Sequence, residues 1–187
     1  MTTVGVLALQ GDVREHLRIL ESLGVDGVAV KHAEQLAALD ALVIPGGEST
    51  TIVKMAIRFD LFEPVREAIS SGLPTYGTCA GMIVLAGALT DGDQPLLGSL
   101  DVVVKRNAFG RQNESFEAGV EVEGLDQPFP AVFIRAPWVD KVGSEVEVLA
   151  TIGDHPVMVR QDHIIATSFH PELTGDSRIH RMLLETI

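Results

Sequence analysis

A single cysteine, Cys79, stands between two glycines in the stretch "GTCAG" (77–81), where an expected strand gives way to an apolar helical pattern. A nucleophile flanked by glycines at such a turn is lifted to the carboxyl edge of a sheet, within reach of a substrate. The helix N-terminus favours the thiolate, and the backbone N–H of Ala80 faces the place where an oxyanion would form. A lone cysteine is more often a buried filler, and the glycines weaken that alternative without removing it.

A thiol nucleophile needs a base, and His170 is the best placed of the six histidines. It ends the run "IIATSF", at the carboxyl end of an expected strand, where open α/β sheets hold their ligands. Glu172 follows two positions later, so in an extended chain both side chains lie on one face and the carboxylate orients the imidazole. "HPE" alone is equally well explained as a polar strand end.

His16 and His180, within amphipathic helices, are interpreted as surface or packing residues.

A glycine pair in "PGGEST" (45–50) also follows an expected strand and precedes a helix. Exposed backbone N–H groups in such a loop bind anions or an oxyanion. Glycine pairs mostly mark turns, so the value of this loop lies in its position.

The order of elements predicts how these residues are brought together. Short apolar runs alternate with amphipathic stretches in the first half, as βαβ units around a parallel sheet do. Asp12 is expected to cap the first helix. The expected strands are 4–9, 26–31, 40–47 and 73–77, and the expected helices are 13–23, 33–39, 49–58 and 62–71.

From Gly98 onward the chain is rich in strand patterns, and a last helix is expected over 177–186. We interpret this half as a mixed sheet that completes one domain, and not as a second domain, because no linker or repeat interrupts it. The sequence therefore predicts a single α/β domain over residues 1–187, with an open, mostly parallel mixed sheet flanked by helices.

Composition excludes several other functions. A net charge of −12 makes binding to nucleic acid unlikely to be the main activity. No apolar run reaches the roughly 18 residues of a membrane span, so no membrane partner is expected. The N-terminus has no signal-peptide pattern and one cysteine cannot form an intrachain disulfide, so a cytoplasmic protein is expected.

Five stretches together, "PGGEST", "YGTCAGMIVLA", "KRNAFGRQ", "FIRAP" and "ATSFHPE", resemble the glutaminase subunits of pyridoxal 5'-phosphate synthase, which are class I (triad) glutamine amidotransferases. The likeness runs nearly from end to end and implies a flavodoxin-like fold. Trp138 departs from it, standing where a small aliphatic residue is expected, and is expected to alter packing near the glutamine pocket.

The resemblance implies hydrolysis of L-glutamine to L-glutamate and ammonia through a cysteine thioester. In that family the cysteine, here Cys79, attacks the side-chain amide, His170 protonates the leaving ammonia and then activates water, and Glu172 orients the histidine. The N–H groups of Gly47 and Ala80 would form the oxyanion hole. No metal and no cofactor of its own is implied. The implied contacts to glutamine are Gly47, Glu48, Ser49, Arg106, Ile134 and Arg135.

The implied partner is the barrel subunit of the synthase, in a large hetero-oligomer. That subunit makes pyridoxal 5'-phosphate, its product, from ribose 5-phosphate and glyceraldehyde 3-phosphate. Gln10 and the segment "GDVREH" (11–16) are expected near the interface. Two alternatives stay open: a glutaminase subunit of another amidotransferase, and a non-catalytic regulatory partner of the synthase.

Overall fold

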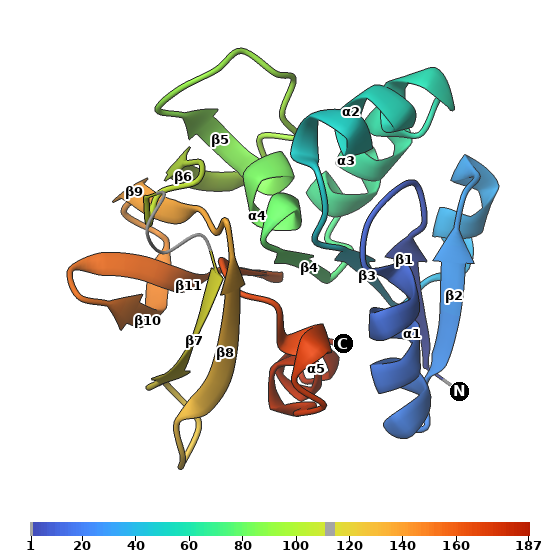
Figure 1. Ribbon diagram of the computed structural model, residues 1–187. Helices are drawn as coiled ribbons and strands as arrows, with labels where there is room; N and C mark the ends of the chain where they lie inside the picture. The colour runs from blue at the N-terminus through green and yellow to red at the C-terminus, as the bar shows by residue number, and fades with distance from the viewer. Residues whose placement is uncertain (1, 111–114) are drawn as a thin grey trace.

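A seven-stranded sheet forms the centre of the molecule (Figure 1), for which a computed structural model describes residues 2–110 and 115–187. Arg111 and Gln112 of the motif "KRNAFGRQ" therefore lie outside the described residues. The strands of the sheet are β1 (Thr3–Leu7), β2 (Asp26–Val30), β3 (Ala41–Ile44), β4 (Thr75–Thr78), β10 (Glu147–Ile152), β11 (His155–Gln161) and β12 (Ile164–Thr167).

The strand order is β10-β11-β12-β4-β3-β1-β2, and the five strands from β12 to β2 are parallel. Their order along the sheet is that of the flavodoxin-like doubly wound fold, in which ligands bind beyond the carboxyl ends of the strands. In the described part of this sheet, β10 pairs with β11 and β11 with β12 in antiparallel fashion. The predicted fold class, an open and mostly parallel mixed sheet flanked by helices, is confirmed.

Both faces of the sheet are buried, because alternate residues of its strands enter two separate apolar clusters. In β3, Leu42 and Ile44 enter the cluster that packs against α2, α3 and α4, while Ala41 and Val43 enter the one that packs against α1 and α5. In the described chain no helix is long and apolar enough to cross a membrane. The α-helices are α1 (Val13–Ser22), α2 (Ser49–Arg58), α3 (Phe62–Ser70), α4 (Ala80–Leu85) and α5 (Arg178–Leu184), and the 3-10 helices are Ala33–Ala38 and Pro171–Leu173.

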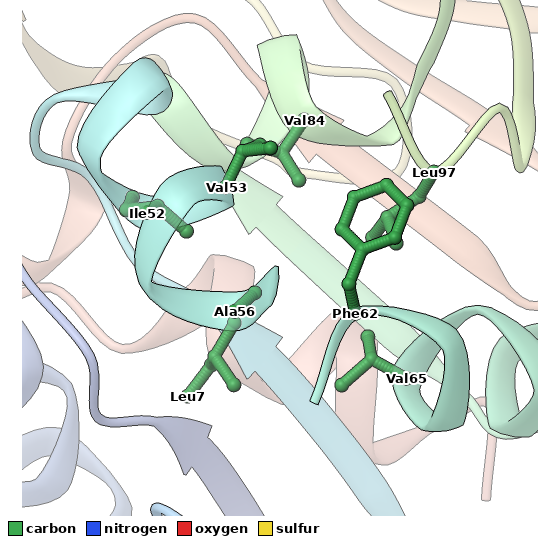
Figure 2. A pocket seen from close by; sticks show the side chains of 8 residues that line it. All are labelled: Leu7, Ile52, Val53, Ala56, Phe62, Val65, Val84 and Leu97. Atoms are coloured by element: carbon green, nitrogen blue, oxygen red, sulfur yellow. The ribbon is translucent and has the colours of Figure 1, made fainter. Parts of the chain in front are cut away.

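The side chains between α2, α3 and the sheet determine where the glycine-rich loop before α2 lies. They meet in a small apolar gap (Figure 2), so α2 is held against the sheet along its inner side. Because the loop 45–48 connects β3 directly to α2, this packing fixes both of its ends. The side chains around the gap are Leu7, Ile52, Val53, Ala56, Phe62, Val65, Val84 and Leu97.

The second half supplies the mixed part of the central sheet, but not all of its strands join that sheet. Only β10, β11 and β12 join the central sheet, while the remaining strands form a three-stranded and a two-stranded sheet. The strand Ala86–Leu89 follows α4 without a loop, so the apolar run after Cys79 is helix only as far as Leu85. The additional strands are β5 (Ala86–Leu89), β6 (Leu100–Lys105) and β9 (Trp138–Val142) in one sheet, and β7 (Ser115–Val120) and β8 (Phe129–Ile134) in the other.

Candidate active site

Four loops at the carboxyl edge of the central sheet meet around one pocket. They follow β1, β3, β4 and β12, which are four adjacent strands of the sheet. Gln10, Gly47, Cys79 and His170 stand on these four loops, one on each, and all four line the pocket. Residues far apart in the sequence therefore share a site because parallel strands end at the same edge.

Cys79 lies on a strained turn between β4 and α4. Its backbone has φ 48° and ψ −98°, a conformation that residues other than glycine rarely adopt, and its N–H donates to Thr167 O at 2.7 Å. A Cβ at Gly81 would lie 2.1 Å from Ile44 O, and one at Gly77 would lie 2.7 Å from the carbonyl carbon of Gly81. Both glycines are therefore needed for the close packing of the elbow.

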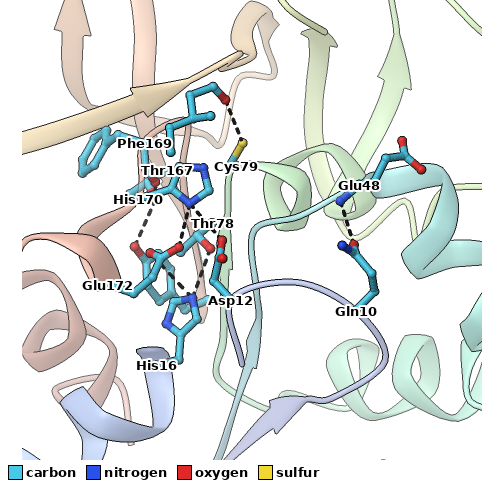
Figure 3. Close-up of polar contacts among 12 residues, drawn as sticks. Gln10, Asp12, His16, Glu48, Thr78, Cys79, Thr167, Phe169, His170 and Glu172 are labelled. Atoms are coloured by element: carbon cyan, nitrogen blue, oxygen red, sulfur yellow. Dashed lines mark hydrogen bonds and ion pairs between the residues drawn. The ribbon is translucent and has the colours of Figure 1, made fainter. Parts of the chain in front are cut away.

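His170 and Glu172 form a buried hydrogen-bonded pair. His170 Nδ1 donates to Glu172 Oε1 at 2.7 Å (Figure 3), and His170 N donates to Val132 O at 2.8 Å. The expectation that an extended chain aligns them was wrong, because residues 171–173 form a 3-10 helix. Pro171 at its first position starts this turn, which folds the carboxylate back under the imidazole.

A second carboxylate reaches the same imidazole nitrogen. Asp12 Oδ2 lies 3.4 Å from His170 Nδ1. Asp12 was expected to cap α1; it occupies the N-cap position but makes no side-chain cap hydrogen bond. Burial lowers the pKa of His170, yet hydrogen bonding with Asp12, Cys79 and Glu172 outweighs burial and raises the pKa to about 12. The imidazole is therefore held as an imidazolium beside the thiol.

The thiol of Cys79 points into the pocket. Its Sγ lies 3.9 Å from Ile134 O, across the site from the glycine-rich loop. Ala80 and Glu172 are buried behind the pocket wall. All six residues implied as glutamine contacts line the pocket together with the cysteine and histidine. The lining residues are Gln10, Asp12, Gly47, Glu48, Ser49, Cys79, Ile83, Arg106, Asn107, Ile134, Arg135 and His170.

The glycine pair of the loop 45–48 allows two close approaches. A Cβ on Gly46 would lie 2.4 Å from Cε1 of the His170 ring. Gly47 has φ +150°, and a Cβ there would lie 2.5 Å from Gln10 Oε1. That amide oxygen accepts the N–H of Glu48 at 2.7 Å, so Gln10 is bonded directly to the loop expected to supply an oxyanion donor.

Glu48 uses its carboxylate to cap α2. The carboxylate accepts Thr50 N at 3.2 Å and Thr51 N at 2.7 Å, and also both threonine hydroxyls. Burial raises the pKa of Glu48, but these hydrogen bonds outweigh it and lower the pKa to about 2. The carboxylate is thus already satisfied by the protein, although Glu48 lines the pocket.

Two arginines at the pocket differ in how they are held. Arg106 is largely buried, with its Nε 4.0 Å from Asp91 Oδ1, and its guanidinium fills the space beside Gly92. Arg135 is exposed and has φ 42°, directly after Ile134. Arg106 is therefore preorganised, and Arg135 remains free to meet an incoming charge.

Two histidines that the sequence indicated as surface or packing residues lie beneath the predicted triad of Cys79, His170 and Glu172. His16 and His180 are both fully buried, with His16 Nδ1 2.9 Å from His180 Nε2. His16 is one of the three buried residues of α1, together with Ile19 and Leu20. One feature of the sequence could have indicated that His16 lies near the site. It stands four positions after Asp12, and residues with this spacing share one face of a helix.

Trp138 lies outside the pocket lining. Its ring stacks on His155 with centroids 3.6 Å apart and meets the edge of Phe109 at 5.3 Å. Among the described residues, one set could share a metal ion: Asp12, His170 and Glu172, whose ligand atoms lie within 4.8 Å of one another. Two of these possible ligand atoms, His170 Nδ1 and Glu172 Oε1, are already engaged in the short hydrogen bond with each other.

An open, mostly parallel sheet with a cysteine on its strand-to-helix elbow, and a histidine–glutamate pair after a neighbouring strand, defines the class I glutamine amidotransferases. The chain belongs to the SNO glutamine amidotransferase family, whose model matches residues 6–187. As a member of that family it is an enzyme that uses the amide nitrogen of glutamine.

Relatives support the same assignment at high identity. The pyridoxal 5'-phosphate synthase subunit PdxT of Parafrankia sp. is 60% identical over 187 residues, covering 98% of this chain and 92% of its own. The protein of that name from Streptomyces griseus is 56% identical, covering 98% and 95%. A crystal structure of a glutamine amidotransferase superimposes with a TM-score of 0.94 at 54% identity, over 98% and 97% of the two chains.

Proposed function

We propose that this chain is the glutaminase subunit of a pyridoxal 5'-phosphate synthase, with Cys79, His170 and Glu172 as its catalytic triad. The observation that carries this is the meeting of a strained elbow cysteine and a carboxylate-bonded imidazole in one pocket. The assignment to a pyridoxal 5'-phosphate synthase is supported by the names of relatives that are more than half identical to the chain.

In the first half of the reaction, the Cys79 thiolate attacks the side-chain amide carbon of glutamine. The N–H groups of Ala80 and Gly47 bind the resulting oxyanion; Ala80 is the first residue of α4, so its N–H has no partner within the helix. His170 gives its proton to the amide nitrogen, the C–N bond breaks, and ammonia leaves behind a γ-glutamyl thioester.

In the second half, the neutral His170 takes a proton from water, which attacks the thioester carbon. The C–S bond breaks, L-glutamate is released, and the thiolate–imidazolium pair is restored. Glu172 stabilises the imidazolium in each half because its carboxylate accepts the Nδ1 proton. No external reductant or oxidant is needed.

Substrate recognition follows from the charges of the pocket. Glutamine is a zwitterion, and Arg106 or Arg135 can pair with its carboxylate. The Glu48 carboxylate is engaged by the cap of α2, so the ammonium is better matched to backbone carbonyls around Glu48 and Ile134. Ser49, whose hydroxyl donates to Gln94 Oε1 at 3.0 Å, closes that side.

Ammonia is then passed to the barrel subunit of the synthase, within a cytoplasmic hetero-oligomer. The contact of Gln10 with Glu48 N supports an interface at the segment 10–16, because a partner that moves Gln10 would also act on the oxyanion loop. Partner binding and glutamine hydrolysis would be coupled by this short connection.

The test is ammonia and glutamate release with and without the candidate synthase subunit. Wild-type protein should release both in its presence, and Cys79→Ala should release neither while keeping the wild-type melting temperature. Undiminished hydrolysis by Cys79→Ala would exclude the proposed mechanism. Co-purification with an enzyme of imidazole or purine synthesis would favour another amidotransferase, and a wild-type complex without glutaminase activity would favour a regulatory subunit.

A further inference from the structure

A buried polar chain continues from the proposed triad into the interior of the fold. His16 of α1 is fully buried and touches three polar groups, of which Figure 3 shows Thr78 and Glu172. Its Nδ1 lies 2.9 Å from His180 Nε2, and its Nε2 lies 3.3 Å from Thr78 Oγ1 and 3.6 Å from Glu172 Oε2. The three contacts come from α5, β4 and the 3-10 helix after β12, so His16 links the elements that present the triad.

One carboxylate oxygen of Glu172 lacks a donor. Oε1 accepts from His170, whereas Oε2 is buried and has no hydrogen-bond partner in the described part of the chain. A buried carboxylate oxygen without a donor is costly, and burial also raises the pKa of Glu172. His16 Nε2 faces Oε2 at 3.6 Å, slightly beyond ordinary hydrogen-bond length.

The contact between the two histidines selects one tautomer. If His16 carried its proton on Nδ1, its Nε2 lone pair would face the Glu172 carboxylate, and the buried His180 Nδ1–H would have no acceptor among the described residues. With both protons on Nε2, His180 donates to His16 Nδ1, and His16 Nε2–H faces Thr78 and Glu172. Only a lone pair on His180 Nδ1 is then left without a partner, which costs less than an N–H.

Both rings are held neutral. Burial lowers the pKa of His180 to about 4. The pKa of His16 lies well below its ordinary value, mainly because the ring is buried and further because of electrostatic repulsion by His180 and His170. Tyr76 of β4 also faces His16, with ring centroids 6.4 Å apart, and its hydroxyl contacts Thr167. A neutral His16 offers Glu172 a proton donor without adding a charge that would compete with the imidazolium of His170.

We propose that His16 is a positioning residue for the triad: its Nε2–H holds the second carboxylate oxygen of Glu172, and His180 fixes the tautomer that makes this possible. The inference rests on the proposed function, because it assigns His16 to the orientation of the proposed general acid–base. A carboxylate held at both oxygens keeps its short bond to His170 while the imidazole gains and loses a proton.

Three variants separate positioning from packing. His16→Phe keeps the bulk and removes both nitrogens, while His16→Gln keeps an N–H donor that reaches the place of Nε2. Tyr76→Phe is the matched control, because it deletes a buried hydroxyl in the same layer that bonds to Thr167 and not to the triad. Each is compared by thermal unfolding, by kcat and KM with the synthase subunit present, and by the pH profile of iodoacetamide alkylation. The chain has one cysteine, so alkylation reports Cys79 alone.

His16→Phe should lower kcat by about tenfold or more with KM nearly unchanged, as expected for losing a hydrogen bond to a charged group. Its alkylation should slow near neutral pH, with the acid limb moved to higher pH, because Glu172 would then be harder to ionise. His16→Gln should recover most of kcat, and Tyr76→Phe should lower only the melting temperature. Wild-type kcat in His16→Phe, or equal losses in both His16 variants that follow the melting temperature, would overturn the proposal.

A measurement on the wild-type protein covers the case in which the variants do not fold. Long-range 1H–15N spectra should find His16 and His180 both protonated on Nε2, and a proton on His16 Nδ1 would contradict the proposal. Failure of the proposed function is distinguishable, since wild-type protein would then release no ammonia while the tautomers and the alkylation profile could still be as expected.

Discussion

Asp12 Oδ2 and His170 Nδ1 lie 3.4 Å apart, although this nitrogen is already hydrogen-bonded to Glu172. The imidazole thus faces one buried and one partly exposed carboxylate on the same side. Two carboxylates favour the charged ring, and they leave Nε2 as the nitrogen available to the thiol. Asp12 also stands two residues after Gln10, whose side chain accepts a hydrogen bond from Glu48 N. One short segment therefore contacts both the imidazole of His170 and the glycine-rich loop.

Removal of the Asp12 charge should lower the pKa of His170. The folded pKa of His170, about 12, lies above the ordinary value near 6.5. The stability that the charged imidazole contributes is therefore complete below about pH 6.5 and is lost as pH rises through the folded pKa. Asp12→Asn should therefore be less stable than wild type at pH 6, and the difference should shrink as pH rises above 9. Urea unfolding at pH 6, 8 and 10 measures this, and a difference that does not change with pH would contradict it.

A methyl group at position 46 should disable the site without unfolding the protein. The added Cβ of Gly46→Ala would lie 2.4 Å from His170 Cε1 and 2.8 Å from Nδ1, so the imidazole must move. Because a displacement of about 1 Å costs on the order of a hundredfold in rate, kcat with the synthase subunit should fall by about that factor. Steady-state ammonia release measures the effect.

Gly119→Ala in β7 is the matched control for that variant. Among the described residues its Cβ would meet only Pro128 Cβ, at 3.5 Å, which is an ordinary contact, and Gly119 lies away from the pocket lining. Its kcat should stay within about twofold of wild type. Equal activity of the two alanine variants would show that the approach of Gly46 to the imidazole does not matter.

The sequence predicts the central sheet well because its strands are buried on both faces, and continuous apolar runs such as "ALVI" (41–44) are distinctive of parallel strands. It did not predict how the second half divides among three sheets, because strand patterns do not specify partners. Cys79, His170 and Glu172 were found from local motifs. Asp12 and His16 were not assigned to the site, because their contacts depend on the docking of α1 against the end of β12, which no spacing along the chain encodes.

Two buried neutral histidines should make the fold sensitive to mild acid. The folded pKa values of His16 and His180 lie below the unfolded value near 6.5, so the unfolded chain binds more protons as pH falls from about 6.5 toward 4. The free energy of unfolding should fall over that range. In His180→Gln the slope should be smaller by up to about 1.4 kcal/mol per pH unit, the contribution of one proton. Equal slopes in urea unfolding between pH 6.5 and 4.5 would contradict this.

The cap of α2 should depend on the charge of Glu48. Its carboxylate accepts two backbone and two hydroxyl donors at the start of the helix, and Glu48→Gln removes the charge and one acceptor oxygen. The free energy of unfolding at pH 7 should fall by about 1 kcal/mol, the usual worth of a cap. The folded pKa of about 2 lies below the ordinary 4.5, so this stability is present above about pH 4.5 and is lost as pH falls toward 2. Glu63→Gln on α3, whose exposed carboxylate pairs with Arg66, should change stability by less than about 0.5 kcal/mol. Urea unfolding at pH 7 and pH 3 should therefore find a deficit for Glu48→Gln that narrows in acid, and a deficit of the same size at both pH values would assign the effect to shape and not to charge.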